Sequence, residues 1–159
     1  MSEQTQAFDL SDDPKHPKYA LTHFTVNEFF DFWPKLEKEM DLIPHTWRHW
    51  TKEYIQQAVA NGAIQVWGIG PPPDAVMVFF TQIGTYPAVK VLSIVWAAGS
   101  FDEEMVPLMD ATLTSFARQS NCTEIEVRGR HGWEPHLRGI GFKKEATVWT
   151  RPVTDVRIN

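Results

Sequence analysis

Apolar residues follow two different spacings along this chain, and the spacing changes several times. Runs that are apolar throughout, or at every second position, predict strands at residues 19–24, 64–69, 75–83, 89–97, 123–128 and 142–150. Stripes of apolar residues at helical spacing predict helices at residues 26–36, 46–60, 102–120 and 132–138. The resulting order, β-α-α-β-β-β-α-β-α-β, predicts an α/β domain.

Several residues mark where these elements begin and end. Thr25 precedes the first helix and Glu28 stands three positions later, which is the capping-box arrangement. Pro34 lies inside the same helix and is expected to kink or divide it, because proline cannot donate the helical hydrogen bond. Gly62 follows the second helix, where glycine readily takes the left-handed conformation that ends a helix. The Gly-Pro-Pro-Pro-Asp stretch at 70–74 predicts a turn within an antiparallel meander.

The predicted elements all fall within one stretch of the chain. Residues 1–17 are polar and contain two prolines, so we expect a flexible N-terminal arm. Residues 18–150 carry every predicted element and should form a single domain, in keeping with a total length of 159 residues. Residues 151–159 are expected to be a C-terminal tail.

Charge and composition exclude several classes of partner. The formal net charge is −5 and the sequence pI is about 5.6, which argues against a nucleic-acid partner. The chain has no apolar run long enough to cross a membrane, and residues 1–18 lack the apolar stretch of a secretory signal. Cys122 is the single cysteine, so no disulfide can form within the chain, which suits a reducing compartment. We therefore expect a cytoplasmic protein with no nucleic-acid or membrane partner.

The second half of the chain carries the sharpest likeness to a known family. A strand at 91–96 is followed by a loop, the long helix, the strand at 124–127 and the dipeptide Gly141-Phe142. In this order and spacing, residues 18–150 resemble the acetyltransferase-like (GNAT) superfamily. The resemblance implies a mixed, mostly antiparallel sheet of about six strands flanked by about four helices. The Arg-Gly-Arg-His-Gly-Trp segment at 128–133 is similar to a branch of GNAT-like proteins encoded by tailed phages and prophages.

In GNAT enzymes, a Gln/Arg-x-x-Gly-x-Gly/Ala motif between a strand and the long helix binds the pyrophosphate of acetyl-CoA. Backbone N–H groups and the positive end of the helix dipole attract the anion there. The resemblance places the cofactor-binding candidates of this chain at Ala98, Gly99, Ser100 and Phe101. The basic first position of the motif is missing here, and only one glycine remains.

Three carboxylates follow these positions and begin the helix; we call Asp102, Glu103 and Glu104 the acidic turn. They complement the helix dipole, but they would repel a diphosphate. At an effective dielectric constant near 20, two unit charges about 4 Å apart repel by roughly 4 kcal/mol, more than one extra amide contact returns. We therefore expect no cofactor, and acetyl-CoA binds only if the chain is an active enzyme after all.

The resemblance also implies catalytic groups that this sequence lacks. GNAT enzymes commonly place a tyrosine four residues before the Gly-Phe pair, where it protonates the departing thiolate, and Leu137 stands at this position. His136 is adjacent, but we expect it to point elsewhere on the helix. Glu124 and Glu126 are the candidates for a general base, although both fall on one face of their strand and would serve equally as solvated residues. No catalytic residue is assigned.

Two further groups have a chemical and a structural interpretation. His45 and His49 are four residues apart, a spacing that can bind zinc on a helix. No glutamate follows His45 and no third ligand lies nearby, so we expect no metal site. Cys122 lies between a helix and a strand, where a small residue packs well, and we prefer packing to a nucleophilic role.

One loop and one helix face are candidates for an interaction surface. The loop contains the basic residues Arg128 and Arg130 and the aromatic anchor Trp133, and its basic cluster is completed by His131 and Arg138. This cluster could bind a phosphate or an acidic partner, or it could simply balance nearby glutamates.

The helix face is an aromatic stripe of Trp47, Trp50 and Tyr54. In the GNAT fold the first two helices flank the acceptor groove, so these rings could receive a substrate or a partner chain. Packing into the core is the alternative.

Three functions remain open. The preferred hypothesis is a phage-type GNAT-fold protein without acetyltransferase activity that binds proteins, among them other virion proteins, as an assembly or virion component of the head, neck or internal core. It would then occur in the host cytoplasm and the virion. The alternative is an active acetyl-CoA-dependent N-acyltransferase acting on an amine of a small molecule or a protein. The third is a regulatory protein that binds a host factor.

Overall fold

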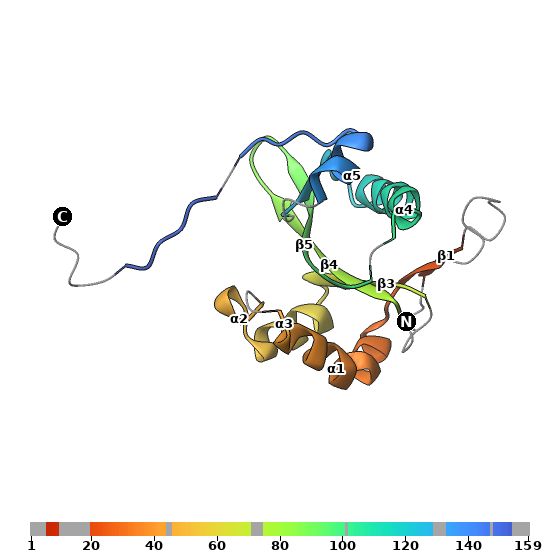
Figure 1. The fold of residues 1–159 in the computed structure, drawn as a ribbon, viewed down its shortest axis with the longest axis vertical. Helices are drawn as coiled ribbons and strands as arrows, with labels where there is room; N and C mark the ends of the chain where they lie inside the picture. Colours follow the sequence, from red (N-terminus) through yellow and green to blue (C-terminus); the bar gives the residue numbers. More distant parts are fainter. Residues whose placement is uncertain are drawn as a thin grey trace.

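The computed structural model describes residues 6–9, 20–43, 46–70, 75–100, 102–128, 133–146 and 148–153. A single sheet forms the centre of the molecule, and helices cover both of its faces (Figure 1). The chain beyond the last helix runs away from this body as an extended segment.

The sheet, within the described residues, contains six strands that lie side by side in chain order. They are β1 (Gln6–Asp9), β2 (Ala20–His23), β3 (Ile64–Ile69), β4 (Met77–Thr85), β5 (Lys90–Gly99) and β6 (Glu124–Val127). Neighbouring strands from β1 to β5 are antiparallel, whereas β5 and β6 are parallel. The parallel pair β5–β6 requires a crossover connection. The helix that lies between these two strands in the chain supplies it.

The helices form two layers. They are α1 (Val26–Asp41), α2 (Thr46–His49), α3 (Lys52–Ala60), α4 (Met105–Gln119) and α5 (Glu134–Gly139). In Figure 1, α1, α2 and α3 lie on one side of the sheet, and α4 and α5 lie on the other. No helix of the described chain is long and apolar enough to cross a membrane.

Two hydrophobic cores lie on the two faces of the sheet, and adjacent residues of β4 belong to different cores. Phe79 is fully buried between the sheet and α4, and Phe80 is fully buried between the sheet and the layer of α1 and α3. Side chains of successive strand residues point to opposite faces, so a strand that is apolar throughout requires cover on both sides.

The fold class predicted from the sequence is confirmed, and so are several element boundaries. Thr25 and Glu28 form the capping box: the Glu28 amide donates to the Thr25 hydroxyl at 3.1 Å and the Thr25 amide donates to the Glu28 carboxylate at 2.9 Å. Gly62 follows α3 with a φ of +84°, the left-handed conformation expected there.

The helices are divided at other places than expected. Pro34 does not divide α1, which runs through it, because the buried residues Phe32 and Leu36 on either side hold the helix against the sheet. The helix predicted at 46–60 is two helices. Thr51 takes an extended conformation between them and its hydroxyl accepts a hydrogen bond from the Tyr54 amide, so a new helix is capped there.

The two ends of the sheet also differ from the expectation. The strand predicted at 142–150 is not formed by the described residues 142–146 and 148–150, which are extended without pairing to the sheet. An alternating sequence favours a strand but does not supply the partner that a strand requires. Conversely, β1 adds a strand at the opposite edge, within the stretch where only a flexible arm was predicted.

One half-buried histidine links the sheet to α4. The imidazole of His23 stacks on the ring of Trp67, with ring centroids 4.4 Å apart, and meets Phe116 edge-on at 5.8 Å. Burial lowers the pKa of His23 from its usual value of 6.5, and the nearby Glu28 carboxylate partly opposes that shift. The neutral imidazole is therefore the form that this site favours.

We expect the free energy of unfolding to fall as the pH drops below about 6.5, because the unfolded chain then binds a proton at His23 more readily than the folded chain does. The contribution is fully present above the unfolded pKa and is lost as the pH approaches the lower folded pKa. Urea unfolding at about pH 7.5 and about pH 5.5 measures it. The drop should be smaller in His23→Gln, and an unchanged drop would contradict the assignment.

Neighbouring phenylalanines of α1 allow a matched test of the core. Phe29 is fully buried and Phe30 is 42% exposed. We expect Phe29→Ala to lower the free energy of unfolding by about 3–5 kcal/mol, because it leaves a cavity. Phe30→Ala makes the same chemical change in the same helix and should cost less than about 1 kcal/mol. Chemical denaturation of both variants measures the two losses. Equal losses of stability would contradict the burial of one ring and the exposure of the other.

Candidate functional site

The pairing between β5 and β6 ends halfway along β5. They pair from Val91 with Glu124 to Ile94 with Val127, and β5 then continues to Gly99 without β6. The register between β4 and β5 shifts at this place, which leaves Val95 as an extra residue in β5. Such a bulge bends a strand and increases its twist. β5 therefore extends beyond the last residue of β6 beside α4.

A groove lies over the paired part of these strands, between α4 and α5. The groove is open on one side, and the space in it and at its mouth amounts to about 490 Å³. We call it the α4–α5 groove. Its lining is Ile94, Val106, Met109, Asp110, Leu113, Ile125, Val127, Trp133, His136, Leu137, Ile140 and Phe142. Almost all of these side chains are apolar, so the groove suits an apolar occupant better than a charged one.

The backbone amides at the start of α4 are already used by their own chain. The Glu104 amide donates to the Asp102 carboxylate oxygen Oδ1 at 3.0 Å. The amides of Met105 and Val106 donate to backbone carbonyls of the acidic turn, at 2.9 and 3.1 Å. Pro107, the next residue, has no amide hydrogen. Four consecutive positions therefore present no uncommitted donor to an anion, although a helix start commonly binds one.

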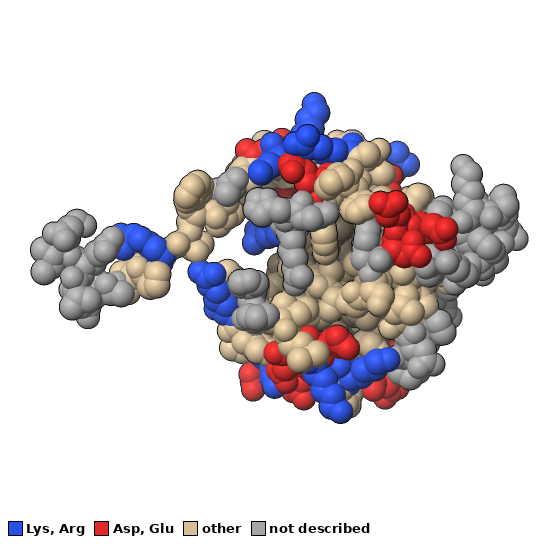
Figure 2. Space-filling model, viewed as in Figure 1, with Lys and Arg blue, Asp and Glu red and all other residues tan. Residues whose placement is uncertain are grey.

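The charge around this helix start also opposes an anion. Figure 2 shows acidic side chains gathered over the α4 end of the molecule. The Glu103 carboxylate lies 3.5 Å from Nδ1 of His136, which is the nearest basic group that α5 contributes. A protonated His136 would balance one carboxylate of the acidic turn, and the turn as a whole would remain negative.

The glycine retained from the pyrophosphate motif has a structural use. Gly99 has a φ of +116°, and a Cβ placed there would collide with the backbone carbonyl of Val76. The following amide, of Ser100, donates to that same carbonyl at 2.9 Å. These contacts join the ends of β4 and β5. Of the other candidate positions, Ala98 pairs with β4, and Phe101 lies outside the described residues.

The position at which GNAT enzymes commonly have their tyrosine acid lies in the groove, and so does the residue before it. Leu137 lines the groove, and so does His136, so the expectation that His136 points elsewhere is wrong. In α5 and at its two caps, the residues that line the groove are 133, 136, 137 and 140, which is the spacing of one helix face. This periodicity could have been recognised in the sequence. Neither Tyr54 nor Tyr86 lines the groove.

The two candidate bases do not lie in the groove. Ile125 and Val127 line it, and strand alternation therefore turns Glu124 and Glu126 to the other face of β6. Glu126 pairs with Arg128 at 3.1 Å on the surface. These carboxylates thus face solvent, and one of them takes part in a surface ion pair, away from the groove.

The structure describes part of the predicted basic loop. Arg128 pairs with Glu126, and Arg138 pairs with Glu134 at 3.0 Å across one turn of α5. Trp133 turns into the groove, where it helps to form the lining. The candidates Arg130 and His131 lie outside the described residues. An interaction surface at this loop remains a prediction.

The aromatic stripe, which runs from α2 into α3, packs largely against the protein's own core. Trp50 stacks on Phe80 with ring centroids 6.3 Å apart, and Trp47 packs on the same core. Tyr54 contacts Trp50 edge-on and is exposed on its outer side. These contacts give the rings a packing function; whether their outer edges also bind a partner remains a prediction.

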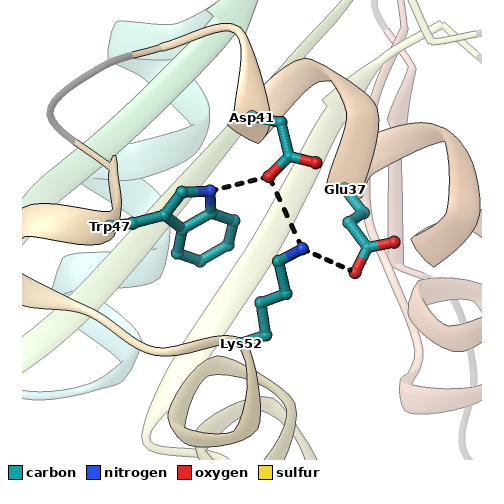
Figure 3. A network of polar contacts seen from close by, with 4 residues as sticks. All are labelled: Glu37, Asp41, Trp47 and Lys52. Atoms are coloured by element: carbon teal, nitrogen blue, oxygen red, sulfur yellow. Dashed lines mark hydrogen bonds and ion pairs between the residues drawn. The ribbon is translucent and has the colours of Figure 1, made fainter.

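A polar network holds Trp47 in place (Figure 3). The indole Nε1 donates to the Asp41 carboxylate at 2.7 Å. Lys52 lies 3.2 Å from Glu37 and 3.5 Å from Asp41, and its ammonium group lies over the Trp47 ring at 5.4 Å. Both carboxylates raise the pKa of Lys52, Glu37 most of all. The network ties α1, α2 and α3 together.

The remaining candidates have no catalytic geometry in the part of the chain that is described. No group of three or more metal-binding side chains occurs there, and His45 lies outside it. Cys122 packs against the core beside α4, and burial raises the pKa of its thiol. A raised pKa keeps the thiol protonated, which disfavours nucleophilic attack.

Comparison with solved structures identifies the class of fold. An aminoglycoside acetyltransferase from an uncultured soil metagenomic sample, in complex with sisomicin, superposes with a TM-score of 0.62 at 14% identity, covering 86% of this chain and 95% of the other. Ribosomal-protein-alanine N-acetyltransferase from Brucella melitensis superposes with a TM-score of 0.59 at 11% identity, covering 86% and 99%.

A third neighbour, described as a predicted acetyltransferase with acetyl-CoA from Clostridium acetobutylicum, gives a TM-score of 0.54 at 11% identity, covering 94% and 95%. No protein-family model and no curated protein sequence matches this chain. The chain therefore has the fold of the GNAT acetyltransferases, and at these identities the likeness concerns the fold alone.

The Asp102 carboxylate should stabilise the start of α4, because it accepts the Glu104 amide. We expect Asp102→Ala to lower the free energy of unfolding by about 0.5–2 kcal/mol. Asp102→Asn keeps an oxygen acceptor. At the same pH and salt it should lower the free energy of unfolding by only about a few tenths of a kcal/mol. Chemical denaturation of both variants measures the difference. Equal losses would show that the charge, and not the hydrogen bond, matters.

Proposed function

We propose that this chain uses the GNAT fold for binding other proteins and does not carry out acetyl transfer. The observation that carries the proposal is the start of α4, where residues 104–107 have no uncommitted amide and the acidic turn supplies negative charge. A coenzyme diphosphate needs the opposite of both. The absence of a tyrosine from the groove lining, in the described chain, supports the same conclusion.

Titration calorimetry with acetyl-CoA tests this proposal directly. We expect no saturable heat up to about 1 mM ligand, which corresponds to a binding free energy weaker than about −4 kcal/mol. A dissociation constant in the micromolar range would overturn the proposal and restore the enzyme.

A designed variant tests the electrostatic explanation. Asp102→Asn, Glu103→Gln and Glu104→Gln remove the charge of the acidic turn, and Pro107→Ala restores one amide donor. We expect the combined variant to bind acetyl-CoA measurably more tightly than the natural chain. If the variant is folded by circular dichroism and still silent, the shape of the site and not its charge excludes the coenzyme.

The biological setting that we propose comes from the likeness of residues 128–133 to phage-encoded proteins. In that setting the chain is an assembly or virion-associated protein, its partners are other virion proteins, and it is found in the host cytoplasm and the particle. Mass spectrometry of purified particles tests this part separately. Absence from the particles, together with normal assembly when the gene is deleted, would contradict it.

One observation favours a second candidate function, an N-acyltransferase. β5 continues past its last pair with β6 at Ile94, so its backbone groups beyond that point have no partner in β6, and the solved neighbours are acetyltransferases. A substrate amine would attack the thioester carbon directly, and backbone groups of β5 would position the carbonyl oxygen. His136 and Asp110 are the polar side chains that line the groove in the described chain. The titration above decides between the two functions.

A further inference from the structure

We propose that the α4–α5 groove binds a short segment of a partner protein in which apolar side chains stand next to a lysine or an arginine. The apolar side chains would fill the groove, and the basic group would pair with the carboxylate of Asp110. This inference rests on the proposed function, because it names the kind of protein segment that the chain would bind in place of a coenzyme.

The face of α5 that lines the groove is only partly covered by the rest of the chain. No residue of α5 is fully buried, and Trp133 and Ile140 at its two caps are half-buried. Trp133, Leu137 and Ile140 nevertheless all line the groove. A helix of six residues is marginal unless its apolar face is packed against something. An occupant of the groove would therefore stabilise α5 while it buries apolar surface.

The opposite wall of the groove, on α4, combines apolar surface with negative charge. Val106, Met109 and Asp110 line the groove from this helix. Glu103 precedes Val106 by three residues and Asp110 by seven, so all three lie on the same side of the helix. The Glu103 carboxylate lies 3.5 Å from His136, which lines the groove from α5. Carboxylates thus flank the apolar part of this wall.

Asp110 is the residue that favours a basic occupant. It is half-buried among apolar groove residues, and within the described part of the chain its carboxylate takes part in no hydrogen bond or ion pair. His136 is the one basic residue of the described lining, and it already lies beside Glu103. Arg128 and Arg138 pair with glutamates on the surface. A carboxylate that is partly withdrawn from water and has no partner attracts a cation.

Other kinds of occupant match the groove less well. An acidic peptide or a diphosphate would meet Asp110 and the acidic turn, which repel it. A purely apolar ligand would cover Asp110 with carbon, and a carboxylate without a partner is costly to bury. The space of about 490 Å³ is within the range of sites that bind a small ligand, so it suits a few side chains of a peptide. A segment with apolar and basic side chains meets both requirements.

Selection from a displayed library of random dodecapeptides tests this proposal with the full 159-residue chain. We expect the selected peptides to share large apolar residues next to a lysine or an arginine. Asp110→Lys reverses the charge of the groove and should select peptides with acidic residues in place of the basic ones. Asp31→Lys is the matched control: it makes the same change at an exposed position of α1 and should select the same peptides as the natural chain.

A labelled selected peptide then measures the contribution of each wall by fluorescence polarisation. Asp110→Asn should weaken binding about tenfold, because the basic group loses its partner. Leu137→Asp should weaken binding at least about tenfold, because it places a charge in the apolar wall. Circular dichroism checks that both variants are folded. Hydrogen exchange gives a second measurement: the amides of α5 should exchange more slowly in the complex, at least about tenfold.

Three results would overturn the proposal: no peptide is selected, the selected peptides lack the basic residue, or Asp110→Lys selects the same peptides as the natural chain. The titration with acetyl-CoA separates this failure from a failure of the proposed function. If neither acetyl-CoA nor any peptide binds, the groove partner is rejected and the proposed function stands. Micromolar binding of acetyl-CoA would instead reject the proposed function, together with the inference that rests on it.

Discussion

Burial of both faces of β4 is the constraint on which the rest of this structure depends. Phe79 and Phe80 are adjacent, fully buried and on opposite faces, so the strand is stable only with a helical layer on each side. The layer that covers Phe79 is α4, which follows β5 directly. The need to cover that face fixes where α4 begins, and it brings the acidic turn to the end of β5. The properties of the candidate site follow from that position.

The GNAT resemblance implies that the start of α4 binds a coenzyme. In this chain the backbone groups there make contacts that stabilise the fold. The carboxylate of Asp102 caps the amide of Glu104, and Gly99 allows β5 to close on β4. Each contact satisfies a backbone group that a ligand would otherwise satisfy. The groove beside it is apolar and bordered by Trp133 and His136, which suits a protein segment better than a diphosphate. A fold shared with enzymes thus does not imply their chemistry, because chemistry depends on the groups at the site.

The two edges of the sheet are treated differently. β1 covers β2 at one edge, while β6 ends the sheet at the other and has no strand beyond it in the described chain. The sequence after α5 alternates as a strand should, yet its described residues stay apart from the sheet.

The sequence alone determined the fold class, the capping box at Thr25, the end of α3 at Gly62 and the acidic turn, because these depend on residues close together in the chain or on their overall pattern. Tertiary structure decided the rest. Whether 142–150 pairs, and whether Glu126 or His136 faces the groove, depends on groups distant in sequence. Pro34 stays inside α1 for the same reason, since packing against the sheet outweighs a lost helical hydrogen bond. Residues close together in the chain determine which helix or strand a segment can form. Contacts with residues distant in sequence determine which part of the protein it packs against.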